Sequence, residues 1–297
     1  MEFLSYLISG LSLGSVYAII ALGYTMVYGI AKMLNFAHGD VIMVGGYVSY
    51  FVAGALASKG AVSGWVAMLV AMVVCTVLGV VIEGLAYKPL RGTPSLAVLI
   101  TAIGVSYFLQ NGAQLLWTSN IKMFPSLFGN AAVSLFGGQV TISTTTIVTI
   151  AACIVIMLVL TWFTGKTKMG KAMRACSEDK AAAQLMGIDV NFTISMTFAI
   201  GSALAAIAGV LLCSAYPTLV PTTGSMPGIK AFTAAVFGGI GSIPGALLGG
   251  ILLGVIEIFA SAYISTQLSN PIVFAVLIIV LLVRPSGLLG KRVREKV

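Results

Sequence analysis

The sequence predicts an all-α polytopic membrane protein, and three observations support this fold class. Of its residues, 59% are hydrophobic and 8% are charged, and the mean hydropathy is +1.08. Soluble globular domains do not have this composition. Apolar stretches of about 20 residues recur along the whole chain, which is the length that crosses a hydrocarbon core of about 30 Å. Alternation of period two is absent, so helices are favoured over a membrane β-barrel.

We expect one transmembrane domain, residues 1–297, with about eight crossings, some of them broken or re-entrant. The full apolar runs cover 7–30, 41–57, 65–86, 96–117, 144–164, 192–213, 245–262 and 272–283. Small residues in the first run, such as Gly14 and Gly23, allow neighbouring helices to approach closely. The glycine-rich stretch 228–243 is short for a span, so we expect a broken or tilted helix packed inside protein.

The distribution of Lys and Arg predicts the orientation of the chain. Basic residues gather around Lys88 and Arg91, in a polar segment at 165–191, and in the tail at 284–297. We therefore expect these three regions in the cytoplasm, and the N-terminus outside. The net charge of +8 is spread over short loops, a pattern typical of membrane orientation and not of nucleic-acid binding.

The polar segment reads GKTKMGKAMRACSEDKAAAQLMGIDVN and follows an apolar run directly. Its apolar residues are spaced as on one helix face, at Met169, Ala172, Met173 and Cys176. Ser177 is a good N-cap, Glu178 and Asp179 suit a first helical turn, and Gly187 is placed to end the helix. We predict a short helix at 178–186 outside the bilayer. A docking surface is favoured over a solvated loop that only orients the protein.

Asn35, His38 and Asp40 form the most unusual polar cluster near the membrane, and His38 is the only histidine. Polar groups at membrane depth require a wet cavity or a partner. The break at 35–39 before a fresh apolar run is typical of a half-helix whose N-terminal amides face an anionic group such as a carboxylate. An ordinary interfacial turn with solvated side chains explains the cluster equally well, so both interpretations stay open.

Other polar residues on apolar runs are weaker candidates for a solute pathway. Ser106 and Gln110, with Asn111, form a polar patch on the run at 96–117. Glu257 is expected to face the interior and to pair with a polar neighbour, whereas Glu83 is expected near the cytoplasmic surface. The stretch 238–250 loosely resembles 35–46, which suggests a matching interrupted segment. Close packing of its glycines explains it better.

No arrangement of residues indicates catalysis, a metal or a bound cofactor. The chain has a single histidine, no GxSxG, no clustered acids and no GxxxxGK[ST] phosphate loop, so we expect that it is not an enzyme and does not itself bind ATP through such a loop. Its four cysteines lack CxxC spacing, which gives no sign of a metal site or a disulfide.

Three long blocks carry a resemblance to a known family. The blocks are SLGSVYAIIALGYTMVYGIAKMLNFAHGD, GKAMRACSEDKAAAQLMGI and KAFTAAVFGGIGSIPGALLGG. They resemble the bacterial branched-chain amino-acid ABC transporter permeases, whose relatives also serve urea, short amides and other small solutes. The resemblance implies an ABC importer permease in the bacterial cytoplasmic membrane.

The implied partners are a second homologous permease, two cytoplasmic ATPases that use ATP, and an extracytoplasmic substrate-binding protein docking on the loops 118–143 and 214–229. Arg174, Glu178, Asp179 and Gly187 match the family's RAxxED…GI pattern in the segment that couples to the ATPases. The alternative is a carrier or channel driven by an ion gradient. Such proteins usually bury several ionisable residues, and here only Asp40 and Glu257 are plausible.

Overall fold

The computed structural model describes residues 2–56, 62–129, 131–135 and 140–290. Its helices are α1 (Glu2–Ala31), α2 (His38–Ala55), α3 (Val62–Ile82), α4 (Ser95–Trp117), α5 (Thr144–Lys166), α6 (Lys168–Glu178), α7 (Lys180–Leu185), α8 (Val190–Ala215), α9 (Ser225–Gly238), α10 (Ile243–Tyr263) and α11 (Ser269–Val283). A π-helix, η2 (Glu83–Tyr87), and a 3₁₀ turn, η3 (Lys88–Leu90), continue α3. Short strands are β1 (Lys122–Met123), β2 (Ala132–Leu135), β3 (Val140–Ser143) and β4 (Thr218–Leu219).

The helices confirm the predicted all-α, multi-pass membrane architecture. Within the described ranges, 6 helices are long and apolar enough to cross a membrane, namely α1, α3 with its π-helical extension, α4, α5, α8 and α10. The helices α2, α9 and α11 are shorter, with 18, 14 and 15 residues. A 14-residue helix is about 21 Å long, too short for a hydrocarbon core of about 30 Å. The stretch 228–243 thus contains most of the short helix α9 and the break before α10. Most of α9 is buried in protein, as expected.

Close glycine contacts hold α1 against α10 in the centre of the bundle. A Cβ on Gly254 would lie 2.2 Å from the Cα of Gly14, and one on Gly250 would lie 2.4 Å from the Cα of Ala18. Only glycine allows backbones to approach so closely. Gly238 similarly lies against the carbonyl oxygen of Gly245. Close packing is therefore the role of Gly238, Gly245, Gly249 and Gly250, whereas Gly241 has a positive φ and no close contact.

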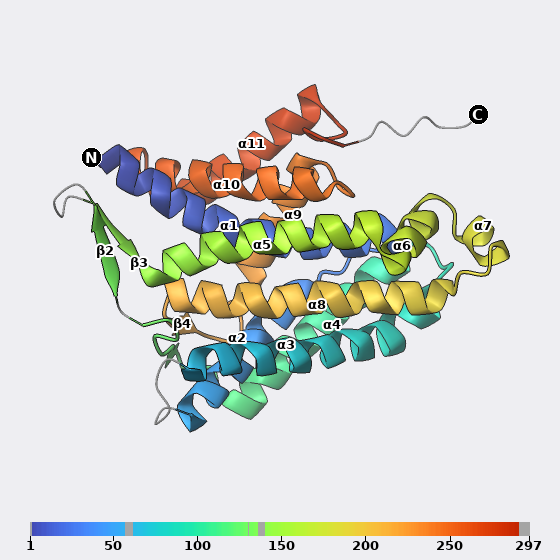
Figure 1. Cartoon of the computed structure of the whole chain (residues 1–297), viewed down its shortest axis with the longest axis horizontal. Coiled ribbons are helices and arrows are strands. Elements are labelled where there is room, and N and C mark those ends of the chain that lie inside the picture. The colour runs from blue at the N-terminus through green and yellow to red at the C-terminus, as the bar shows by residue number, and fades with distance from the viewer. Residues whose placement is uncertain (1, 57–61, 130, 136–139, 291–297) are drawn as a thin grey trace.

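Two predicted outer loops lie side by side at one end of the molecule. β1 pairs with β4 in antiparallel fashion, with Lys122 opposite Leu219, and this pairing joins the segment at 118–143 to the segment after α8. A second ribbon is formed by β2 and β3. Figure 1 shows β2, β3 and β4 at the same end as the N-terminus, and α6 and α7 at the opposite end.

The polar segment forms two helices, so the single helix predicted at 178–186 is wrong in its start. Asp179 ends α6 in an extended conformation and caps α7, its carboxylate accepting from the amides of Ala181 and Ala182 at 2.8 and 3.0 Å. Ser177 is not the cap; its hydroxyl donates to the Arg174 carbonyl inside α6. Gly187 has a φ of +80° and follows the helix end as predicted. The stripe is confirmed, since Met173 and Cys176 are buried.

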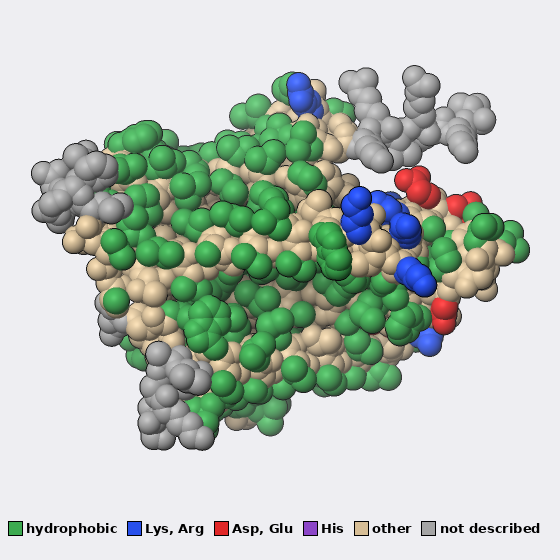
Figure 2. Space-filling model, in the orientation of Figure 1, with side chains coloured by type: hydrophobic (Ala, Val, Ile, Leu, Met, Phe, Trp, Pro, Cys, Tyr) green, Lys and Arg blue, Asp and Glu red, His purple; other side chains and the backbone are tan. Residues whose placement is uncertain are grey.

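Charged side chains gather at the end formed by α6 and α7, while apolar side chains cover the sides of the bundle (Figure 2). Charged side chains at one aqueous end and apolar side chains along the sides are typical of a body that spans a membrane. Of the predicted basic tail at 284–297, the residues after 290 lie outside the described part of the chain.

Candidate functional site

The segment between α1 and α2 is buried inside the bundle. Lys32 has a φ of +58° and turns the chain away from α1, so that α2 begins at His38 in the interior. Asn35, His38 and Asp40 are 4%, 1% and 2% exposed. Their burial favours the half-helix interpretation and rules out a solvated interfacial turn.

His38 shows how deep this segment lies. A Cβ on Gly23 would be 2.6 Å from His38 Nε2, and Gly201 also approaches the ring. Gly201 lies near the middle of α8 (Val190–Ala215). The ring also packs on Tyr24 with centroids 4.5 Å apart. The chain therefore re-enters the bundle to about the middle of its long helices before α2 starts.

A second interrupted helix starts at the same place. A Cβ on Gly224 would lie 1.8 Å from the Gly39 carbonyl oxygen, and one on Gly228 would lie 3.0 Å from the Gly39 Cα. The N-termini of α2 and α9 therefore meet. The outer loop predicted at 214–229 is consequently too long, because residues 225–229 form the first turn of α9 within the bundle. The partner of the break at 35–39 is this turn, and not the stretch 238–250.

Neither of these two helix starts has a side-chain cap, and the starts of α4 and α11 also lack one. Five other helices have one, from Ser143, Thr167, Asp179, Asp189 and Ser242. The first amides of a helix have no intrahelical partner and carry a partial positive charge. The first amides of α2 and of α9 thus lie near each other, and neither N-cap residue provides a side chain that accepts a hydrogen bond from them.

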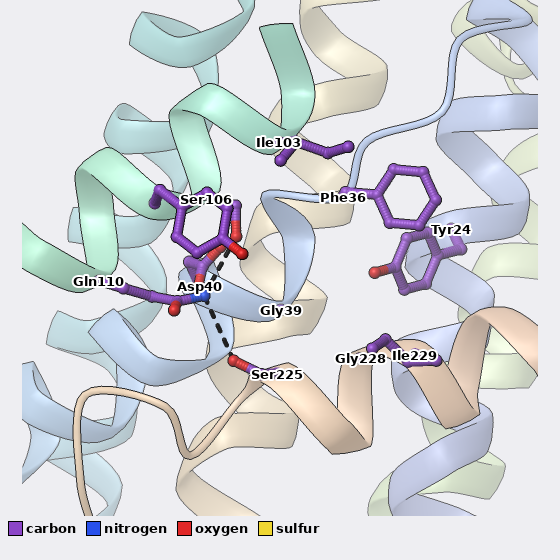
Figure 3. A pocket seen from close by; sticks show the side chains of 11 residues that line it. Tyr24, Phe36, Gly39, Asp40, Ile103, Ser106, Gln110, Ser225, Gly228 and Ile229 are labelled. Carbon is purple, nitrogen blue, oxygen red and sulfur yellow. Dashed lines mark hydrogen bonds between the residues drawn. The ribbon is translucent and has the colours of Figure 1, made fainter. Parts of the chain in front are cut away.

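A pocket of about 270 Å³ lies at this junction. Its walls come from α1, α2, α4, α9 and the re-entrant segment, and the lining residues are Tyr24, Phe36, Gly39, Asp40, Ile103, Ser106, Tyr107, Gln110, Ser225, Gly228 and Ile229. Gln110 Nε2 lies 2.8 Å from Asp40 Oδ1, 3.1 Å from Ser106 Oγ and 3.3 Å from Ser225 Oγ. Figure 3 shows these four side chains converging on one side of the pocket, with Phe36, Ile103 and Tyr24 around it.

The pocket unites three of the predicted pathway residues, Asp40, Ser106 and Gln110. Asn35 and His38 do not line it, but they hold the adjoining segment: Asn35 Oδ1 accepts from the Tyr87 hydroxyl at 2.9 Å. Sequence reasoning missed Tyr24 on α1, and it missed Ser225 and Gly228 on α9. The small residues of TTGSMPG, at 222–228, were a signal of close backbone approach there.

Glu257 lies away from this pocket. Its Oε1 accepts from Lys230 Nζ at 2.6 Å and its Oε2 accepts from the Tyr17 hydroxyl at 2.9 Å. The carboxylate borders a second pocket of about 470 Å³ toward the outer loops, which Tyr216 and Thr223 also line. The expected polar partner of Glu257 is thus Lys230, a buried cation that the sequence analysis did not single out.

Glu83, which is expected near the cytoplasmic surface, is buried in protein, with 1% of its surface exposed. It pairs with Arg91 and accepts from the Ser195 hydroxyl at 2.6 Å. Arg91 also donates to Asn191 at the start of α8. Glu83 is the first residue of the π-helix, and Tyr87 at the end of the π-helix is buried as well.

Comparison with known proteins identifies the family. A family model described as "Branched-chain amino acid transport system / permease component" matches residues 6–281. The chain belongs to this family. It is 47% identical to the high-affinity branched-chain amino acid transport system permease protein LivH of Escherichia coli, over 100% of the chain and 98% of that protein. It is 46% identical to BraD of Pseudomonas aeruginosa over the same shares. A probable LivH of Methanocaldococcus jannaschii is 32% identical over 92% of the chain and 88% of that protein.

In this permease family member, the four residues predicted for ATPase coupling all lie on the exposed charged end. Arg174 is exposed on α6, where its guanidinium donates to the Gly165 carbonyl at 3.3 Å. Glu178 and Asp179 are exposed at the break between α6 and α7, and Gly187 follows α7. Two large apolar side chains, Leu185 and Met186, are 89% and 82% exposed beside them. Such an apolar tip rimmed by charge is typical of a protein docking surface.

Proposed function

We propose that this chain is the permease subunit of an ATP-driven importer and moves branched-chain amino acids, or a related small polar solute, by alternating access. Its family membership and the printed names of its relatives support the substrate class. The membrane is the bacterial cytoplasmic membrane, with the C-terminus in the cytoplasm. The charge gathered at the α6–α7 end supports that orientation.

The observation that carries the proposal is the meeting of two uncapped helix starts beside a buried carboxylate. In the proposed site, the amides at Gly39 and at the start of α9 receive the carboxylate of the amino acid. Asp40 receives its ammonium group, because a buried anion favours a cationic partner. Phe36, Ile103 and Ile229 border the same pocket and suit an aliphatic side chain.

The energy comes from partner subunits in this proposal, since the sequence contains no phosphate loop. Two cytoplasmic ATPases bind ATP and dock on the segment 165–191, with Leu185 and Met186 at the contact. Their closure pulls α6 and α7, and the membrane helices switch the pocket from outside-open to inside-open. A second, homologous permease completes the membrane core.

An extracytoplasmic binding protein delivers the solute to the opposite end. We assign its docking surface to 118–143 and to the segment between α8 and α9. The pairing of β1 with β4 supports this, because it makes one continuous surface from two loops that are about 100 residues apart in sequence.

The pocket is tested by Asp40→Asn in the complete complex reconstituted in liposomes. We expect leucine uptake to fall at least about tenfold, since a hydrogen bond between charged groups contributes about 1.5–3 kcal/mol. Glu2→Gln is the matched control, because it is also an acid-to-amide change and Glu2 is exposed at the start of α1, away from the pocket. Unchanged uptake by Asp40→Asn contradicts the assignment of this pocket.

The coupling segment is tested by replacing Glu178 and Asp179 with Lys. The charge reversal is expected to abolish uptake while the chain remains in the membrane, because it inverts the charge of the docking surface. Normal uptake by this variant contradicts the coupling role. Uptake by the lone chain in liposomes without ATPases contradicts the ATP-driven mechanism and favours a carrier driven by an ion gradient.

A further inference from the structure

One lysine of the cytoplasmic segment contacts the membrane helix that leads into the pocket. Lys180, the first residue of α7, donates from Nζ to the Ala31 carbonyl oxygen at 2.8 Å. Ala31 is the last residue of α1, and the last carbonyls of a helix have no partner within the helix. A cation there also interacts favourably with the negative end of the helix dipole.

Among the residues that the structure describes, no carboxylate pairs with the Lys180 ammonium. Within the described part of the chain, the two ion pairs are Arg91 with Glu83 and Lys230 with Glu257. Burial lowers the pKa of Lys180, and the positive charges of Arg91 and Lys32 lower it further. Burial and the neighbouring positive charges are therefore unfavourable for this ammonium group, and its hydrogen bond to the Ala31 carbonyl holds it there.

The helices that carry Lys180 pack against the same end of α1. Met173 and Cys176 of α6, together with Ala183 of α7, form a buried apolar cluster with Met26 and Ile30 of α1. Because packed cores deform little, a displacement of α6 and α7 is passed to the last turn of α1.

The chain turns into the pocket wall within a few residues of this contact. Lys32 follows Ala31 with a left-handed φ of +58°, and Phe36 lines the pocket. Between them, Asn35 is held from the other side by the buried hydroxyl of Tyr87. Tyr87 ends the π-helix, a rare structure that is frequent at functional sites.

We propose that Lys180 is a positioning residue that transmits movement of the cytoplasmic segment to residues 32–37 and so to the wall of the solute pocket. When α6 and α7 move, the Ala31 carbonyl follows the lysine, and the segment 32–37 shifts between this moving end and the fixed contact at Tyr87. The inference rests on the proposed function, and it adds the route by which ATP binding reaches the pocket.

The first test measures solute taken up per ATP hydrolysed by the complete complex in liposomes. Lys180→Met keeps the aliphatic stem and removes the donor, so this ratio should fall at least about tenfold, as expected for the loss of a charged hydrogen bond. Lys180→Arg keeps a cationic donor and should retain at least about half of the wild-type ratio. Lys88→Met is the matched control, since Lys88 is exposed at the same end and lies outside 165–191. A wild-type ratio in Lys180→Met overturns the inference, as does a loss in Lys180→Arg equal to that in Lys180→Met.

The second test does not depend on the solute, and its first comparison uses only the wild-type complex. Hydrogen–deuterium exchange of the amides at 32–37 is measured in the wild-type complex with and without ATP. We expect ATP to change the exchange of this segment, and Lys180→Met to remove that change. No ATP-dependent change in the wild type overturns the inference.

If leucine is not transported but the ATP-dependent change depends on Lys180, the proposed substrate fails and the transmission route stands. If Glu178 and Asp179 are required for uptake but Lys180→Met behaves as wild type, the proposed function stands and the route falls.

Discussion

The buried ion pair between Lys230 on α9 and Glu257 on α10 offers the sharpest quantitative prediction. Its nitrogen–oxygen distance is 2.6 Å, and the two side chains are 8% and 13% exposed. The second carboxylate oxygen accepts from Tyr17 on α1. These contacts tie the short helix α9, which forms one wall of the solute pocket, to two long helices. Glu257→Gln keeps the shape of the side chain and removes its charge.

The size of the effect follows from the burial of both groups. Removing one partner of a buried ion pair leaves an uncompensated charge and costs about 3–5 kcal/mol, whereas replacing both partners by neutral groups is often close to neutral. Because Glu257 keeps a little solvent contact, we expect about 3 kcal/mol for Glu257→Gln. The double variant Lys230→Met with Glu257→Gln should cost less than about 1.5 kcal/mol. Lys230→Met alone should also cost about 3 kcal/mol, because it leaves Glu257 unpaired. The coupling energy between the two sites should therefore exceed about 4 kcal/mol.

The assay is denaturant unfolding of the purified complex in detergent. The quantity compared between variants is the free energy of unfolding of this chain. Glu2→Gln is the matched control, since Glu2 is exposed at the start of α1, and it should change the unfolding free energy by less than about 0.5 kcal/mol. Leucine uptake should recover in the double variant together with stability, because the position of α9 recovers. A double variant that is as unstable as Glu257→Gln would refute the reasoning, since the cost then arises from lost packing and not from an unpaired charge.

Two further predictions concern the helix starts. Gly224→Ala should abolish uptake and destabilise the chain by at least about 2 kcal/mol. Its Cβ would lie 1.8 Å from the Gly39 carbonyl oxygen, and overpacking costs about 1–3 kcal/mol. Wild-type uptake and unfolding by this variant would show that α2 and α9 do not meet there. Asp179→Ala should destabilise α7 by about 1 kcal/mol because it removes the cap of two amides, and it should accelerate amide exchange at Ala181 and Ala182. Ser177→Ala should leave their exchange unchanged, since Ser177 is not the cap, and equal effects of the two substitutions would contradict the assignment.

Features that depend on local sequence were predictable. Apolar runs of membrane length located the long helices, and the clustering of basic residues located the charged end. The exposed polar segment was recognised as helical from its stripe of Met173 and Cys176. The helix start within it was misplaced by two residues, because Ser177 and Asp179 are both good N-caps and the choice depends on where α6 stops.

Features that depend on how helices face each other were not predictable. Asp40, Ser106 and Gln110 were singled out as polar residues on apolar runs, but nothing in their spacing indicated that Gln110 contacts Asp40 from another helix. Lys230 was read as the start of a glycine-rich stretch, and only the packing of α9 on α10 reveals its partner. Glu83 is buried because it pairs with Arg91 and with Ser195 on α8, and the partner on α8 is 112 residues away in the sequence.

The sequence by itself determined that the chain is a helical multi-pass membrane protein with one charged end. These properties follow from the transfer of each side chain between water and hydrocarbon, which depends on the residue and its near neighbours. Only the tertiary structure decided that residues 32–40 lie in the interior, that α2 and α9 begin against each other, and that Lys180 reaches the end of α1. Those facts depend on contacts between segments far apart in the chain, where glycine backbones and buried polar pairs must match in space.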